Sequence, residues 1–147
     1  MNRNFRALST LSPTHVDQLV DMYQSGRWTR GRIRSDVATM LQGSDVVFAY
    51  EGDEGKLFAF APAITDGVFK AMIFDVIVRK GLRGSRLGAR LLQEVREHPV
   101  LSRVRHVELY CLPELQHPET WSLCVKMARS AGIEPTTPGF GGQYSIH

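Results

Sequence analysis

A buried strand, a glycine-containing turn and an amphipathic helix follow one another between residues 72 and 95. Met72–Val78 is an apolar run rich in β-branched residues and interrupted only by Asp75, which is typical of a strand buried on both faces. The basic turn Arg79–Arg83 comes next. Four apolar residues then recur at helical spacing: Leu87, Leu91, Leu92 and Val95. The sequence therefore predicts a strand–turn–helix unit.

The start of this helix has the character of a phosphate-binding site. We expect Gly84 and Ser85 to open it, and the free N–H groups of a first helical turn carry roughly half a positive charge. The alternative is an ordinary strand-to-helix corner, and the glycines alone do not separate the two. Two other phosphate-binding patterns are excluded, because the chain contains neither G-x-x-x-x-G-K-[ST] nor G-x-G-x-x-G followed by an acid at the right distance.

The turn resembles the pyrophosphate-binding segment of GCN5-related N-acetyltransferases, whose pattern is Q/R-x-x-G-x-G/A. Arg83 and Gly88 match the first and last positions, whereas Arg86 stands where the middle glycine is expected. The arginine side chain is compatible with the pattern if it points into solvent. The resemblance implies that the backbone of this segment binds the pyrophosphate of coenzyme A. The residues concerned are Arg83, Gly84, Ser85, Arg86, Leu87, Gly88 and Ala89.

Length and composition predict one globular domain over residues 1–147. The 18 basic and 15 acidic residues leave a net charge of only +3, which does not favour a nucleic-acid-binding face. Cys111 and Cys124 have no metal-binding spacing and are expected to be reduced, which suits a cytoplasmic location. No window approaches the roughly 18 apolar residues of a membrane span, and we expect no signal peptide.

Hydrophobic periodicity and turn residues predict the remaining elements. Ser12 and Pro13 are typical of a helix start, and Gly26 of its end. Three strands joined by tight turns predict an antiparallel meander, and a strand that follows a helix predicts a parallel neighbour, so the sheet should be mixed. The expected strands are Asn4–Leu8, Asp45–Tyr50, Lys56–Ile64, Val68–Val78, Val104–Leu112, Ile133–Thr137 and Gln143–Ile146, and further helices should end near Leu41 and cover residues 85–98 and 121–131.

This order of elements is the one that the acetyltransferase family shows, and the similarity is highest from Lys70 to Glu114. That stretch resembles small bacterial members and also glucosamine-6-phosphate acetyltransferases. The resemblance implies an α/β (α+β) chain with the acyl-CoA N-acyltransferase fold. Its sheet would be mixed, mostly antiparallel and twisted, with a V-shaped splay between strands 4 and 5 and helices on both faces. Acetyl-CoA would lie in the splay, with its pantetheine amides bonded to the backbone of Val76 and Val78.

The resemblance also implies chemistry without a side-chain nucleophile, in which an amine attacks the thioester directly. Asp75, the only charge in its strand, is either a structural carboxylate or an acid–base group. Tyr110 is either a core tyrosine or the donor that protonates the leaving thiolate. Many family members place a tyrosine four residues before the glycine that ends the last helix, but here that position is Ala128.

Trp28 lies among arginines in the stretch SGRWTRGRIR. Packing over the edge of the core is one interpretation, and contact with an anionic or planar group is the other. In the family this region lines the acceptor side of the site, so the resemblance makes Trp28 and Arg30 candidate substrate contacts.

We therefore expect an acetyl-CoA-dependent N-acetyltransferase that acts on a small primary amine, without a metal, a nucleic-acid partner or a membrane. The alternative is an acyl-CoA-binding regulatory module without efficient turnover, because the usual tyrosine is missing. Nucleic-acid binding is a third hypothesis, which the scattered arginines support poorly. The glycine-rich C-terminal segment offers an edge for pairing with a second copy, so a homodimer is a further expectation.

Overall fold

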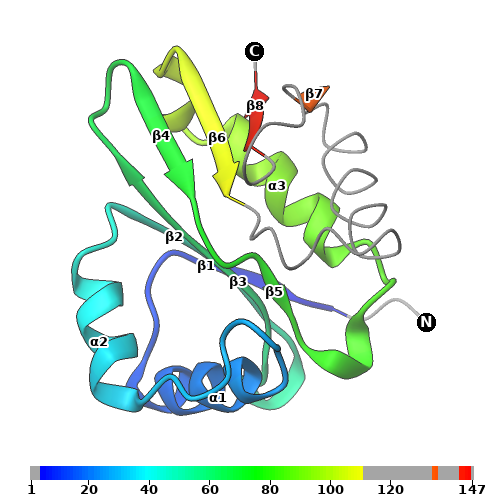
Figure 1. The fold of residues 1–147 in the computed structure, drawn as a ribbon. Coiled ribbons are helices and arrows are strands. Elements are labelled where there is room, and N and C mark those ends of the chain that lie inside the picture. The colour runs from blue at the N-terminus through cyan, green and yellow to red at the C-terminus, as the bar shows by residue number, and fades with distance from the viewer. Residues whose placement is uncertain (1–3, 111–133, 136–142, 147) are drawn as a thin grey trace.

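The computed structural model describes residues 4–110, 134–135 and 143–146 (Figure 1). Its strands form an 8-stranded sheet in the order β1-β2-β3-β4-β6-β8-β7, and β5 pairs with β3 beside this path. The α-helices within these described ranges are α1 (Pro13–Gln24), α2 (Arg34–Gln42) and α3 (Leu87–Glu97). The strands are β1 (Arg6–Leu8), β2 (Val46–Glu51), β3 (Leu57–Thr65), β4 (Lys70–Ile73), β5 (Ile77–Val78), β6 (His106–Tyr110), β7 (Glu134–Pro135) and β8 (Gln143–Ile146).

The sheet is mixed, which confirms the expectation from sequence. Strands β1 to β4 pair antiparallel in chain order, whereas β4 and β6 are parallel neighbours joined through α3. Strands β8 and β7 complete the sheet in antiparallel pairing. A parallel neighbour requires a crossover connection, and α3 supplies it. The expected closing strand Gln143–Ile146 is confirmed at both ends.

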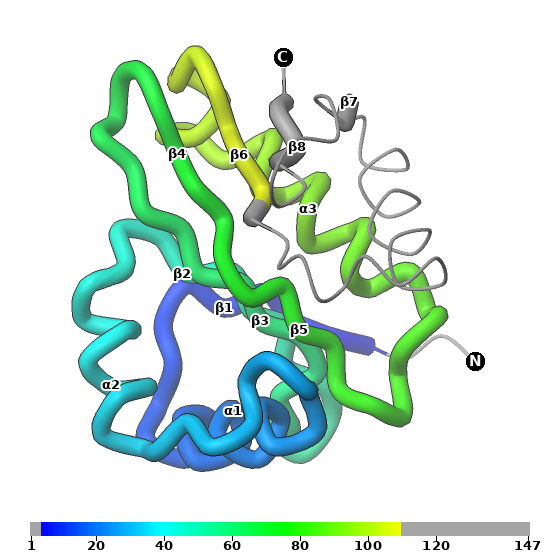
Figure 2. The backbone as a smooth tube through the Cα atoms, viewed as in Figure 1, coloured from blue at the N-terminus to red at the C-terminus, as the bar shows by residue number. Residues whose placement is uncertain are grey.

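Helix α3 lies on one face of the sheet and helices α1 and α2 lie on the other (Figure 2), and the buried residues form two apolar clusters. Helix α3 packs Leu91, Leu92 and Val95 into a cluster to which β3 contributes three buried alanines, whose small side chains let the helix approach closely. Helices α1 and α2 cover the other face. The helix start predicted at Ser12 is confirmed, because its hydroxyl accepts the His15 amide at 3.2 Å.

The prediction of one continuous strand from Val68 to Val78 is wrong. Strand β4 ends at Ile73 and β5 begins at Ile77, with Asp75 between them at a φ of +45°. The register explains the break: residues 61 and 62 of β3 lie opposite residues 74, 75 and 76, because Phe60 pairs with Ile77 and Ala63 with Ile73. The extra residue is a β-bulge, which apolar periodicity alone does not reveal.

The helix predicted from Gly84 begins later than expected, at Leu87. Residues 80–82 form a 3₁₀ turn, and the Ser85 amide donates to the Leu82 carbonyl at 3.2 Å, so it is not free to bind a phosphate. Ala128, Cys111, Cys124 and the helix predicted over residues 121–131 lie outside the described residues. In the described ranges no helix combines the length and apolar character needed to cross a membrane, and no group of three metal-ligating side chains occurs there.

Candidate functional site

The parallel strands β4 and β6 separate at the bulge. Their register ends with the pair Ile73 and Leu109. Beyond that pair the chain continues into β5, which stays on β3. On the other side Tyr110 continues β6 and pairs with Gln143 of β8. Within the described residues the two strands therefore diverge where one of them bulges, which is the splay that the family resemblance implied.

The backbone of β5 directs polar groups toward this splay. The Arg79 amide donates to the Phe58 carbonyl at 2.8 Å, so residue 79 points its amide toward β3. Antiparallel ladders alternate, and Val78 therefore directs its N–H and C=O away from β3. The Val78 carbonyl accepts the Nε of Arg83 at 3.2 Å, which closes the corner onto the strand. Val76 follows the bulge itself and is half-buried.

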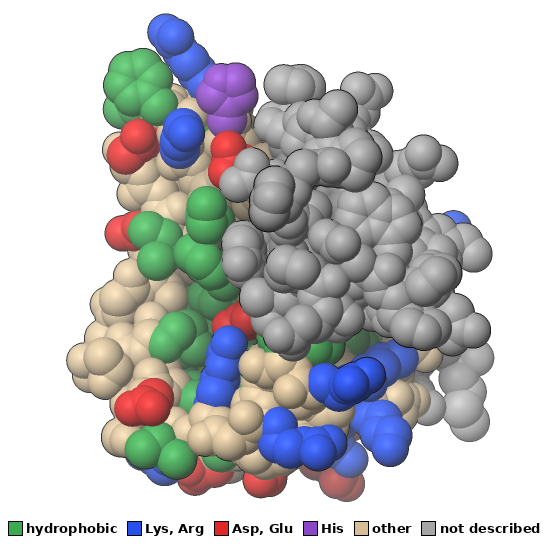
Figure 3. Space-filling view, viewed as in Figure 1, with side chains coloured by type: hydrophobic (Ala, Val, Ile, Leu, Met, Phe, Trp, Pro, Cys, Tyr) green, Lys and Arg blue, Asp and Glu red, His purple; other side chains and the backbone are tan. Residues whose placement is uncertain are grey.

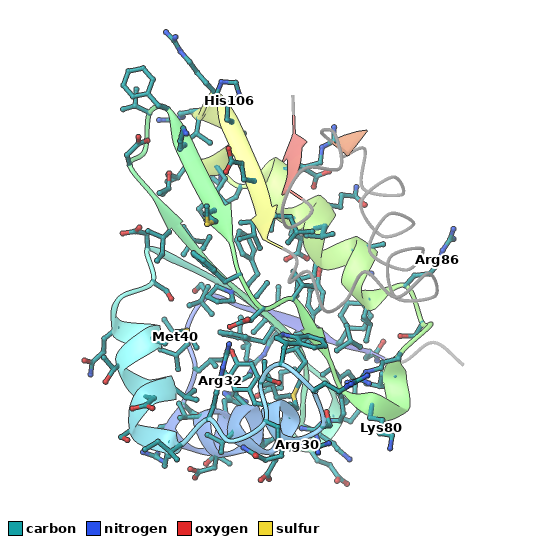
Figure 4. The ribbon with its side chains drawn as sticks, viewed as in Figure 1. Arg30, Arg32, Met40, Lys80, Arg86 and His106 are labelled. Carbon is teal, nitrogen blue, oxygen red and sulfur yellow. The ribbon has the colours of Figure 1, made fainter. Side chains whose placement is uncertain are left out.

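The N-terminal end of α3 has backbone amides that donate to no other described residue. Arg86 caps it in the left-handed conformation, with a φ of +65°, and the first helical bond runs from the Arg90 amide to the Arg86 carbonyl at 3.0 Å. The amides of Leu87, Gly88 and Ala89 precede that bond, and within the described part of the chain they have no acceptor. Figure 4 shows the Arg86 side chain pointing outward from the helix start. This end can hold an anion.

Asp75 makes an ion pair with Arg32 of the loop that joins α1 to α2. Arg32 Nη1 donates to Asp75 Oδ2, and Nη2 donates to Oδ1 at 3.2 Å. The side chains are only 18% exposed for Asp75 and 33% for Arg32, so solvent screens the pair only in part. Figure 4 shows Arg32 between the helices and the strand that contains the bulge. Two segments far apart in the sequence therefore meet at this carboxylate.

The Tyr23 ring packs against the guanidinium of Arg32. Arg32 Cζ lies 4.7 Å from the centroid of the Tyr23 ring, a cation–π contact. Burial raises the pKa of the Tyr23 hydroxyl above its usual range, and the nearby Asp75 charge raises it further. Burial alone would lower the pKa of Arg32, but the hydrogen bond and charge of Asp75 raise it instead. The tyrosine therefore stays neutral and the arginine charged at any physiological pH.

The structure brings only some of the predicted site residues together. Trp28 is half-buried in the α1–α2 loop and Arg30 is exposed there. Among the described residues, the hydrogen bonds and the ion pair of the Asp75 carboxylate go to Arg32 and to neither of these side chains. Arg32 of the same loop pairs with Asp75 instead, and Tyr23 of α1 contacts its guanidinium. The sequence has no signal that distinguishes Arg32, since the same short loop also contains Arg27 and Arg30.

Exposed cations gather on the surface beside this site. In Figure 3, Lys and Arg side chains cluster on the lower part of the molecule, over the α1–α2 loop and the corner that precedes α3. The Arg83 guanidinium reaches the Ser25 hydroxyl at 3.4 Å, which places the corner against the end of α1. Such a surface favours an anionic ligand. The exposed cations of the two segments are Arg27, Arg30, Lys80, Arg83 and Arg86.

The comparison with known sequences finds one relevant similarity. The chain is 27% identical over 115 residues to the GCN5-related N-acetyltransferase 1, chloroplastic, of Arabidopsis thaliana. The aligned region covers 78% of this chain and 58% of that protein, so the chain spans less than two thirds of its relative. No family model matches the sequence.

Solved structures share the fold over nearly the whole chain. A candidate acetyltransferase from Acinetobacter baylyi ADP1 superposes with a TM-score of 0.77 at 14% identity, over 99% of this chain and 94% of that one. The GCN5-related glucosamine N-acetyltransferase region of a fungal multi-domain GH3 β-N-acetylglucosaminidase gives a TM-score of 0.74 at 12% identity, over 94% of this chain and 18% of that chain. At such identities these matches establish the fold. The chain therefore has this fold, and its sequence is similar to that of a GCN5-related N-acetyltransferase.

Proposed function

We propose that the chain is a single-domain acetyltransferase that moves the acetyl group of acetyl-CoA to a primary amine of a small acceptor. The observation that carries the proposal is the divergence of β4 and β6 after Ile73 and Leu109, at a bulge whose neighbour Val78 turns its backbone toward the opening. Free amides at the start of α3 support it, because they suit a pyrophosphate at one end of the same opening.

The proposed cofactor contacts divide between strand and helix. The backbone of Val76 and Val78 would bond the pantetheine amides. The amides of Leu87, Gly88 and Ala89, together with the backbone at Gly84 and the charge of Arg83 and Arg86, would hold the pyrophosphate. Ser85 takes part through its place in the turn rather than through its amide, which is already bonded. No metal is required for this arrangement.

Acetyl-CoA supplies an activated thioester, and the chain supplies position, charge stabilisation and proton transfer. The amine nitrogen forms a bond to the acetyl carbon while the carbon–sulfur bond breaks. The N–H of Val76 would donate to the developing oxyanion. The ammonium proton must leave and the thiolate must gain one, and we assign these roles to Asp75 and Tyr110 respectively. Tyr110 lies at the mouth of the splay by register, although its side chain lies outside what the structure describes.

The acceptor would enter from the α1–α2 loop. Trp28 is half-buried there and Arg30 exposed, and we propose that both contact it. The surrounding cations favour an acceptor that carries an anionic group besides its amine. A cytoplasmic location and a homodimer remain predictions from sequence.

A thermal-shift titration with coenzyme A, followed by thiol release from acetyl-CoA, tests the proposal. We expect coenzyme A to raise the Tm of the wild type, since a ligand of the native state stabilises it by mass action. Gly84→Asp should abolish the shift, because it places an anion beside the phosphates and puts a side chain at a φ of +82°. Gly67→Asp is the matched control, since Gly67 has a φ of +76° in a distant turn. An unchanged Tm at millimolar coenzyme A contradicts the proposal.

The second candidate is a module that binds acyl-CoA without efficient turnover. Ala128 favours it, because many family members have a tyrosine at this position to protonate the thiolate. Coenzyme A would then raise the Tm as above, but a broad panel of amines would give no thiol release above the background of hydrolysis. Release with one amine from the panel eliminates this candidate.

A further inference from the structure

The ion pair between Arg32 and Asp75 joins the two segments that the proposed reaction needs to align. Arg32 belongs to the loop assigned to the acceptor, and Asp75 belongs to the bulge assigned to the cofactor. The residues are 43 positions apart in the chain, and their pairing is bidentate, a geometry that fixes orientation as well as distance.

The loop side of this pair is held by its own contacts. Gln24 of α1 accepts the Gly31 amide at 3.1 Å and donates to the Arg32 carbonyl at 3.1 Å. The buried Thr29 hydroxyl donates to the Tyr23 carbonyl at 2.7 Å, and the Tyr23 ring supports the guanidinium. These contacts fix the position of Arg32 in the loop. Because Arg32 is paired with Asp75, they also restrain the position of the bulge.

The backbone conformation of Asp75 in the bulge requires stabilising contacts. Asp75 has a φ of +45°, a conformation that disfavours a residue with a side chain. A left-handed residue persists only where its surroundings over-determine it. The Phe74 amide contributes by donating to the Pro62 carbonyl at 3.0 Å, and the guanidinium of Arg32 holds the side chain itself.

We infer that Arg32 is a positioning residue that couples the acceptor loop, residues 25–33, to the cofactor bulge, residues 74–76. The identity of the two ligands, the acceptor and coenzyme A, rests on the proposed function, whereas the contacts between the loop and the bulge do not. Because coupling between two sites is reciprocal, coenzyme A in the splay restrains the loop, and the loop held in place favours coenzyme A.

Limited trypsin digestion of the whole chain measures the coupling, since the loop contains the cleavage sites Arg27 and Arg30. Asp75→Asn removes the charge but keeps a residue that tolerates left-handed backbone. Without ligand it should raise the rate of cleavage after Arg27 and Arg30 about tenfold. Cleavage after the distant, exposed Arg103 should not change, which separates loop release from global unfolding.

The matched control is Asp17→Asn, which breaks the exposed pair of Arg34 with Asp17 at 2.5 Å and should leave loop cleavage as in the wild type. Coenzyme A at 1 mM should slow loop cleavage in the wild type and not in Asp75→Asn. Arg32→Lys, which keeps the charge and loses the bidentate fork, should fall between the two. In turnover assays Arg32→Gln should raise the KM for the amine and lower kcat together, and the rescue by Arg32→Lys should be partial in both.

Equal loop cleavage in Asp75→Asn and the wild type would overturn the coupling while coenzyme A binding, measured separately by thermal shift, stands. Failure of the wild type to bind coenzyme A would overturn the proposed function and the coupling to that ligand. Faster loop cleavage in Asp75→Asn with unchanged protection by coenzyme A would also overturn the coupling. The ion pair would then restrain the loop without linking it to the binding of coenzyme A.

Discussion

Gly84 and Arg86 both have left-handed backbones, with φ values of +82° and +65°, on either side of Ser85. Such a pair turns the chain sharply between the 3₁₀ turn and α3, and the next three amides have no acceptor among the described residues. Glycine adopts this conformation freely, whereas arginine is strained in it. The family pattern places a glycine at the position of Arg86, and the φ value gives the physical reason for that preference.

Opposite stability changes are therefore expected at these two positions. Arg86→Gly should increase the free energy of unfolding by about 1 kcal/mol, because it removes the left-handed strain. Gly84→Ala should decrease it by about 1 kcal/mol for the same reason, although a Cβ at Gly84 would meet no atom within 4 Å. Urea unfolding at pH 7 measures both, and changes of the same sign would contradict this account of the corner.

Val78→Pro should weaken binding of coenzyme A by about threefold to tenfold, the equivalent of one neutral hydrogen bond of roughly 0.5–1.5 kcal/mol. The Val78 amide points away from β3, so its loss should leave the ladder intact. Ile77→Pro is the control, because by alternation it removes an amide bonded to β3 and should lower the Tm. Calorimetric titration gives the affinities. An unchanged affinity in Val78→Pro would remove this amide from the proposed cofactor contacts.

Leu91→Ala should decrease the free energy of unfolding by about 2–5 kcal/mol, because it leaves a cavity between α3 and the sheet. Leu91 is 1% exposed and lies in the cluster under this helix. Val100→Ala, at a residue that is 41% exposed, should change it by less than about 0.5 kcal/mol. Similar values for the two variants would show that α3 does not pack as described.

The turn between β3 and β4 should make stability depend on acid pH through Asp66. Its carboxylate accepts the amides of Lys70, Val68 and Phe69 at 3.0, 2.9 and 2.7 Å, and these bonds lower the pKa of Asp66 in the folded protein. The unfolded chain therefore binds a proton more readily. The stabilisation is complete above the unfolded pKa of about 3.9 and is lost as the pH falls through the lower folded value.

Asp66→Asn removes this dependence while keeping an oxygen acceptor. The wild type should exceed the variant in unfolding free energy at pH 7, and the difference should shrink toward pH 2. Urea unfolding across this range measures it. If the difference in unfolding free energy stayed constant with pH, the charge of Asp66 would not be the source of its stabilising effect.

Much of the fold could be predicted because its signals are local. Ser12 and Pro13 identify a helix start through the chemistry of the first turn, and the glycine-rich turn before Gln143 indicated the closing strand β8. The mixed sheet followed from which elements precede each strand. The bulge could not be predicted in this way. An apolar run shows that a strand is buried, but it does not show how many of its residues lie opposite a given stretch of the neighbouring strand. Only the pairing with β3 shows that residues 74–76 contain an extra residue, and the φ of +45° distinguishes Asp75 among them.

Only the tertiary structure determines which side chains lie next to Asp75. The sequence by itself determined the order of the elements, the basic turn before α3 and the family resemblance, since these depend on neighbours along the chain. It did not determine which arginine of the α1–α2 loop meets the carboxylate, or that Tyr23 supports it. Those contacts depend on how helix and loop pack across the sheet, where residues distant in sequence become neighbours and burial makes a paired charge far more favourable than an unpaired one.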